Sequence, residues 1–152
     1  MSESKNASES DTPALYDKVH QLALEMIKSS ETNDLQAMWL AYNSLNQLCK
    51  DNEYSGVDHP FQWEILADFT NDPKTAIRLY HNALKLALKA DFREYVASIL
   101  ISLAENYLEL GERVLAWKEA LAADQVARET KNLRLRTEIS EFLLEMSASS
   151  KD

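Results

Sequence analysis

The sequence predicts an all-α protein of about seven helices, arranged as antiparallel pairs in one continuous array. The chain has two glycines and three prolines among 152 residues, and its large stock of Ala, Leu, Glu and Lys favours helices over sheets and turns. Apolar residues recur at three- and four-residue spacing through most of the chain, with short breaks between the periodic segments. A stripe of small residues also returns at long intervals, which indicates an internal repeat.

The predicted helices follow from the periodic segments and from the prolines that begin three of them. Pro13, Pro60 and Pro73 each stand where a helix would start, a position that tolerates proline because the first-turn N–H has no partner in the helix. The connections are short, so neighbouring helices should pack antiparallel. The expected spans are residues 13–29, 34–50, 60–70, 73–90, 93–110, 113–130 and 133–146.

The chain divides into one domain and two tails. Residues 1–11 and 148–152 are mostly Ser, Glu, Asn, Asp and Lys, so we expect disordered tails at both ends. Residues 12–147 should form a single helical-repeat domain. The break at residues 51–58 is assigned to a loop within that domain, because a division there would leave two helices and a tail to form a core unaided.

The repeat is visible as small residues at matching offsets in two predicted helices, with a weaker copy in a third. Small side chains at this spacing let helix backbones approach closely, as stacked antiparallel pairs require. The three copies are Ala116, Ala120, Ala123 and Ala127; Ala76, Tyr80, Ala83 and Ala87; and Ala37, Ala41 and Ser44.

The most complete copy reads Leu100-x2-Leu103-Ala104-x2-Tyr107-x3-Gly111-x4-Ala116-x3-Ala120-x2-Ala123. This order and spacing resembles the tetratricopeptide repeat, and the likeness is stronger over residues 60–130 than over residues 13–50. The resemblance implies a right-handed superhelix of helix pairs, an α-solenoid, in which Gly111 allows the tight turn. Two features depart from the family: Arg128 stands where proline is usual, and the repeat length is about 40 residues rather than about 34.

The resemblance also implies a binding face on the concave side, lined by the first helix of each pair. Because the side chains there would be apolar and acidic, we expect a basic or amphipathic protein segment as the partner. The chain would then be an adaptor, or a dedicated chaperone-like or neutralising partner. The residues assigned to this face are Ser98, Ile101, Ser102, Glu105, Leu108 and Glu109, with Phe61, Ile65 and Phe69 beside them.

The last predicted helix allows two interpretations. Its apolar face matches a helix that packs on the preceding pair and caps the array. The alternative is a structural, self-associating protein that forms a homodimer through Leu135, Ile139 and Phe142. The apolar face consists of Leu135, Ile139, Phe142, Leu143 and Met146.

Other classes of function have little support in the sequence. The formal net charge is −9, which disfavours nucleic acid as a partner. No apolar run has the length of a membrane helix, and the N-terminus lacks a secretory signal, so we expect a cytoplasmic protein with no membrane partner. The single cysteine, Cys49, is interpreted as a buried small hydrophobe.

Catalytic and metal chemistry also lack their usual patterns. His20, His59 and His81 lie on different predicted elements, without the spacing of a zinc site. The sequence contains no glycine-rich phosphate loop and no nucleophile elbow. Glu105 and Glu109 are one turn apart and could in principle serve acid–base chemistry, but solvated or partner-facing charge is the more common role. We therefore expect no enzyme activity, no cofactor and no metal.

Overall fold

A computed structural model of the chain describes residues 14–149, which form seven α-helices and no strand. The all-α class and the seven helices are confirmed for this part of the chain, while Pro13 and the predicted tail at 1–11 lie outside it. Within the same residues, no helix is both long and apolar enough to cross a membrane. The helices are α2 (Tyr16–Glu31), α3 (Leu35–Asp51), α4 (Pro60–Asp68), α5 (Pro73–Ala90), α6 (Arg93–Glu109), α7 (Arg113–Ala127) and α8 (Leu133–Ser149).

Two of the three proline-marked helix starts are confirmed. Pro60 and Pro73 are the first residues of α4 and α5. The residue before each proline caps the helix: His59 Nδ1 accepts a hydrogen bond from the amide two residues on at 3.0 Å, and an Asp72 oxygen accepts one from the Thr75 amide at 3.2 Å. These bonds satisfy N–H groups that have no partner inside the helix.

The turn predicted at Gly111 is also confirmed. Gly111 has φ 82°, and its amide donates to the Leu108 carbonyl while the Glu112 amide donates to the Tyr107 carbonyl, both at 2.9 Å. This pair of bonds is the Schellman motif, which needs a left-handed residue after the helix. The turns after α2 and α5 use non-glycine residues in the same conformation, Asn33 and Asp91.

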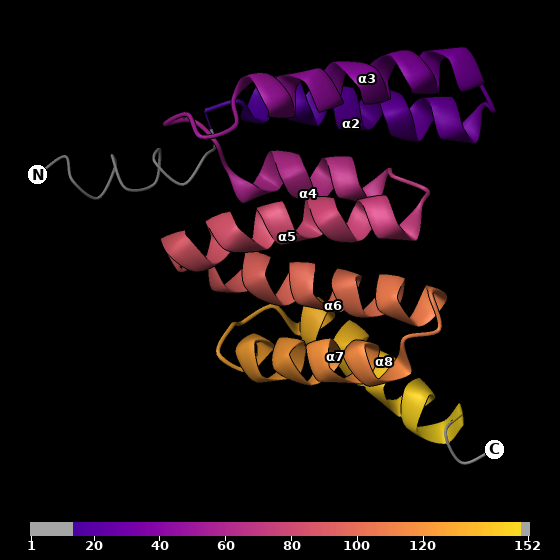
Figure 1. Cartoon of the computed structure of the whole chain (residues 1–152), viewed down its shortest axis with the longest axis vertical. Helices are drawn as coiled ribbons and strands as arrows, with labels where there is room; N and C mark the ends of the chain where they lie inside the picture. The colour runs from indigo at the N-terminus through magenta and orange to yellow at the C-terminus, as the bar shows by residue number, and fades with distance from the viewer. Residues whose placement is uncertain (1–13, 150–152) are drawn as a thin grey trace, which may run out of the picture.

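The helices stack as successive pairs along the long axis of the molecule (Figure 1). The pairs are α2–α3, α4–α5 and α6–α7, and α8 packs on the last of them. The first helices contact one another in succession, from α2 to α4, α6 and α8, whereas α3, α5 and α7 make no such contacts within residues 14–149. The first helices therefore share one side of the stack, which we call the first-helix face.

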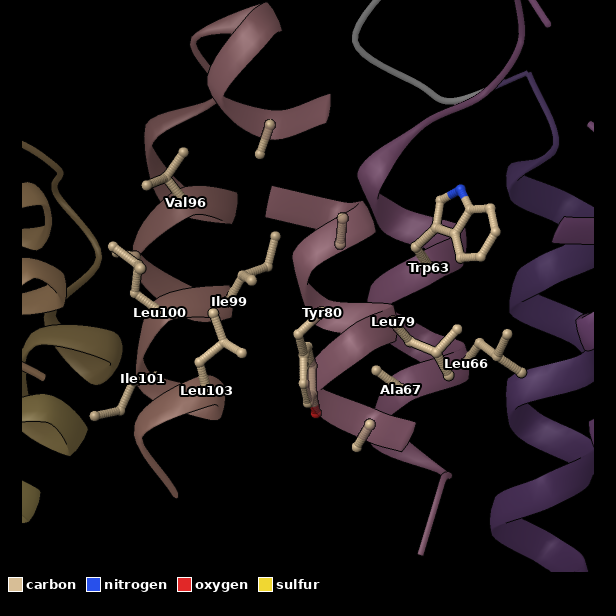
Figure 2. Close-up of a cluster of buried hydrophobic side chains, with 14 of the residues drawn as sticks. Trp63, Leu66, Ala67, Leu79, Tyr80, Val96, Ile99, Leu100, Ile101 and Leu103 are labelled. Atoms are coloured by element: carbon tan, nitrogen blue, oxygen red, sulfur yellow. The ribbon is translucent and has the colours of Figure 1, made fainter. Parts of the chain in front are cut away.

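The small-residue stripes lie in the core, as the repeat predicts. All four residues of the stripe on α5 and all four of the stripe on α7 are buried. The prediction for the weak copy on α3 is wrong at Ser44, because this residue is exposed. The buried face of α3 consists of Ala41, Leu45 and Cys49. Figure 2 shows the neighbouring core, where Tyr80 lies between its own helix α5 and the side chains of Ile99 and Leu103 on α6.

The C-terminal helix caps the stack and is longer than predicted. Leu135, Ile139 and Met146 are buried against the preceding pair. Arg113 Nη2 on α7 donates to the Met146 carbonyl at 3.1 Å and to Ser149 Oγ at 3.2 Å. These bonds hold the last turn, so α8 continues two residues into the segment predicted as a tail. The dimer predicted through Leu135 and Ile139 would need α8 to detach, because both side chains are already covered.

Candidate protein-binding face

The structure brings together most of the residues that the sequence assigned to a binding face, but not Ile101. Ile101 is only 2% exposed, and Figure 2 shows its side chain pointing away from Tyr80, toward the end of the stack. The prediction that Ile101 faces a groove is wrong because α8 packs on α6 and covers that side. Leu108 is half-buried and belongs to neither of the two hollows described below.

Two hollows open on the first-helix face. The first, which we call the Glu105 hollow, has a volume of about 390 Å³ and lies between α4, α5 and α6. The second, the Glu64 hollow, has a volume of about 360 Å³ and lies between α4, α6 and α8. The Glu105 hollow includes Asp68, Tyr80, Ser102, Glu105, Asn106 and Glu109 in its lining, and the Glu64 hollow includes Glu64, Glu94, Tyr95, Ser98, Arg134 and Glu138.

Glu64 is the most buried carboxylate of the face. Its residue is 9% exposed, and one side-chain oxygen accepts a hydrogen bond from Ser98 Oγ at 2.6 Å. Burial raises the pKa of Glu64 to about 7; the bond from Ser98 opposes this rise, and the charge of Asp68 adds to it. A group with this pKa changes its charge within the physiological range.

Two further carboxylates on the same face have raised pKa values for related reasons. Burial raises the pKa of Asp68 to about 6; the hydrogen bond donated by Tyr80 Oη opposes the rise, and the charge of Glu138 adds to it. Burial also raises the pKa of Glu105 to about 7, with smaller contributions from the charges of Glu138 and Asp68. Both residues keep part of their surface in solvent, which screens the interactions between them.

Glu64, Asp68, Glu105 and Glu138 thus act on one another electrostatically, and we call them the carboxylate cluster. None of the four belongs to an ion pair in the described part of the chain. Arg134 is the basic side chain that lines the Glu64 hollow. Concentrated negative charge without a paired cation produces a field that attracts basic groups.

An aromatic and apolar area lies beside the carboxylate cluster, at the N-terminal end of the face. The Tyr16 ring stacks on Phe61 of α4 at 5.1 Å and on His20 at 5.3 Å, measured between ring centroids. Leu24 and Ile27 follow Tyr16 and His20 at helical spacing and are exposed. Phe61 and Ile65 of α4, and Phe69 just after its end, are half-buried and pack against the core.

Several members of this face were missed by sequence reasoning. Tyr16 and Glu138 belong to helices outside the recognised motif, so the motif gave no register for them. Glu64 and Asp68 carried a signal that could have been used, because they stand one turn apart in the apolar segment Pro60–Asp68. Because Asp and Glu are rarely buried without a partner, two carboxylates in an apolar helix indicate that they line an opening.

The other groups singled out in the sequence have structural contacts. Cys49 is fully buried, as predicted, and burial raises its pKa to about 12. His20 stacks on Tyr16, His59 caps α4, and His81 Nε2 lies 3.3 Å from a tyrosine hydroxyl. Across residues 14–149, no three His, Cys, Asp or Glu side chains gather closely enough to hold a metal ion.

Comparisons of the chain with protein-family models, with curated proteins and with solved structures find no match. The first-helix face is therefore the feature of the molecule from which a function can be inferred. That face combines aromatic rings, exposed aliphatic side chains and four interacting carboxylates over neighbouring helices.

Proposed function

We propose that this chain is a cytoplasmic protein-interaction module without catalytic activity, and that its first-helix face binds a basic or amphipathic segment of another protein. The observation that carries the proposal is the carboxylate cluster, whose members have no ion-pair partner in the described residues; burial and the neighbouring carboxylates raise the pKa values of Glu64, Asp68 and Glu105. Lys or Arg side chains of a partner would relieve this repulsion and keep the carboxylates ionised.

The apolar area gives the partner segment a second means of attachment. An amphipathic helix or an extended segment would place apolar side chains against Tyr16, Phe61 and Leu24, and basic side chains over the carboxylate cluster. The aromatic rings supply most of the contact area, and the charges select the partner and orient it. Because the face has both an apolar area and a cluster of carboxylates, we propose a partner that is both apolar and basic.

The order of helix contacts supports a tetratricopeptide-like array as the scaffold of this module. Each first helix contacts its own second helix and the next first helix, the connectivity expected of stacked helix pairs. We propose that the stack is a right-handed superhelix and that the first-helix face is its concave side. Arrays of this kind use the concave side to hold extended segments of other proteins.

The test is capture of partners from native lysate by the intact chain and by two charge-reversal variants. The first variant, Glu105→Lys with Glu109→Lys, changes two exposed carboxylates of the Glu105 hollow. The matched control, Glu25→Lys with Asp51→Lys, makes the same charge change at exposed sites on α2 and α3, outside both hollows. Circular dichroism and melting curves establish that both variants are folded.

The expected result is a protein that the wild type and the control capture and that the hollow variant loses. Capture should weaken at high salt, since exposed charges are screened. It should also weaken as the pH falls below about 6, because Glu64, Asp68 and Glu105 then become protonated. Equal capture by all three proteins would overturn the assignment of the binding face.

A further inference from the structure

A third hollow lies at one edge of the stack, between the loop that joins α3 to α4 and the second half of α5 (Figure 1). Its volume is about 620 Å³, which is within the usual range of small-molecule sites. It shares no lining residue with the Glu105 hollow or the Glu64 hollow. We call it the Trp63 pocket. Its apolar lining consists of Pro60, Trp63, Leu86, Ala90 and Phe92.

The loop side of the Trp63 pocket is held in place by Asp58. One oxygen of this carboxylate accepts hydrogen bonds from Trp63 Nε1 at 2.7 Å and from Gln62 Nε2 at 3.1 Å. The other oxygen accepts a hydrogen bond from the Tyr54 amide at 3.2 Å, where the backbone has φ 67°, a conformation that tyrosine rarely adopts. The loop and the indole ring are thus positioned before any ligand binds, which lowers the cost of binding.

The acceptor groups on the loop side already have partners. Asp58 accepts the three hydrogen bonds just described. Ser55 Oγ donates to a backbone carbonyl at 2.6 Å and accepts from a backbone amide at 3.3 Å. His59 Nδ1 accepts the hydrogen bond that caps α4. The charge of Glu53 and a hydrogen bond to it raise the pKa of Tyr54, so the Glu53 carboxylate lies beside the Tyr54 hydroxyl.

The α5 side of the pocket, by contrast, presents donors that have no partner. Asn82, Lys85 and Lys89 stand at positions i, i+3 and i+7 of the helix and therefore lie along one face of it. None of these three side chains has a hydrogen bond or an ion pair within residues 14–149. His59 adds a donor, because burial lowers its pKa and the neutral ring carries its proton on Nε2 when Nδ1 accepts.

We propose that the Trp63 pocket binds a small aromatic carboxylate. The carboxylate receives charge-assisted hydrogen bonds from Lys85 and Lys89, and the ring packs on the apolar lining that includes Trp63 and Phe92. A cationic ligand would instead meet two ammonium groups that have no counter-charge of their own. The volume is that of a small-molecule site, so we assign the pocket to a free small molecule rather than to a segment of a protein.

Titration of the intact chain with 2-naphthoate, followed by NMR, tests the proposal. The indole N–H signal of Trp63 and the backbone amide signals of Asn82 and Lys85 should shift and reach saturation. The neutral analogue 2-naphthylmethanol should bind about tenfold more weakly, because it cannot form the charge-assisted bonds. The cationic analogue 2-naphthylmethylammonium should bind more weakly still.

Variants separate the contribution of the charge from that of the apolar lining. Lys85→Gln with Lys89→Gln should weaken the binding of 2-naphthoate about tenfold and leave that of 2-naphthylmethanol unchanged. The matched control, Lys28→Gln with Lys118→Gln, makes the same charge change at exposed sites on α2 and α7, outside the pocket, and should leave both affinities unchanged. Ala90→Phe, which adds a ring at an exposed lining position, should weaken both ligands. Circular dichroism establishes that the variants are folded.

Four results would overturn the proposal. The Trp63 signal could show no saturable shift at millimolar 2-naphthoate, the three analogues could bind equally, or the control pair could weaken binding as much as the pocket pair. A blocked tripeptide with phenylalanine between two glutamates could bind more tightly than 2-naphthoate, which would assign the pocket to an acidic protein segment instead. The Glu105→Lys, Glu109→Lys variant should bind 2-naphthoate normally, so failure of this proposal and failure of the proposed function are distinguishable.

Discussion

Replacement of Glu64 by glutamine tests the electrostatics of the first-helix face directly. The pKa of Glu64 is about 7 in the folded protein, against its ordinary value of 4.5 in the unfolded chain. Below pH 4.5 the carboxyl is protonated in both the folded and the unfolded chain. Between pH 4.5 and 7 it is ionised mainly in the unfolded chain, so the free energy of unfolding falls as the pH rises. Above pH 7 the full loss is present.

The size of this loss follows from the two pKa values. Each pKa unit corresponds to about 1.4 kcal/mol, so Glu64 should lower the free energy of unfolding by about 3 kcal/mol above pH 7. Glutamine keeps an oxygen that can accept the Ser98 bond and never ionises. Glu64→Gln should therefore be more stable than the wild type by up to about 3 kcal/mol at pH 8, and nearly equal to it at pH 4.5.

Urea unfolding at several pH values measures the difference in the free energy of unfolding between Glu64→Gln and the wild type. Subtracting the wild type from the variant removes the effects of groups that do not interact with Glu64, including His59, whose pKa is lowered by burial and which acts in the opposite direction. Glu25→Gln, at an exposed site on α2, is the control for the replacement of a surface carboxylate by an amide. If the difference between Glu64→Gln and wild type were the same at pH 4.5 and pH 8, the assigned burial penalty would be wrong.

Three further predictions concern the scaffold. Gly111→Ala should cost about 1 kcal/mol in urea unfolding because φ is 82° with open space around the Cβ, while Gly56→Ala, also in open space and without a positive φ, should be close to neutral. Asp58→Ala should cost about 2 kcal/mol, because an Asp58 oxygen accepts the Trp63 Nε1–H bond at 2.7 Å and the buried indole would lose its partner. Leu103→Ala should lower the free energy of unfolding by roughly 2–5 kcal/mol through the cavity left at a fully buried site, measured by the same method.

The fold was predictable where local chemistry and the repeat agreed. Pro60, Pro73 and Gly111 each determine a helix boundary through the geometry of their own backbone, and that geometry does not depend on distant packing. The stripes on α5 and α7 recur because close helix contact requires small residues. Ser44 shows the limit of this reasoning, since α3 packs with the larger Leu45 and Cys49 and its register could not be transferred from the other pairs.

The site was less predictable because exposure depends on what covers each helix. Ile101 stands in a motif position that was assigned to the groove, but it is buried in the structure, where α8 packs on the helix that carries it. Glu64 and Asp68 were missed because the sequence does not show that hollows lie beside their helix. Their helix is apolar and short, and only the tertiary structure shows that its two carboxylates face hollows shared with α5, α6 and α8. A helical pattern predicts on which face of its helix a residue lies, but not which other element packs against that face.

The same carboxylates connect the stability of the chain with its proposed function. Glu64, Asp68 and Glu105 each have a raised folded-state pKa, so each makes the unbound protein less stable at neutral pH than its protonated form would be. A cationic partner favours the ionised form and removes that penalty, and the relief adds to the affinity. Neutral substitutions in the cluster should therefore stabilise the free chain and weaken partner binding together, a trade-off typical of sites that selection keeps for function rather than for stability.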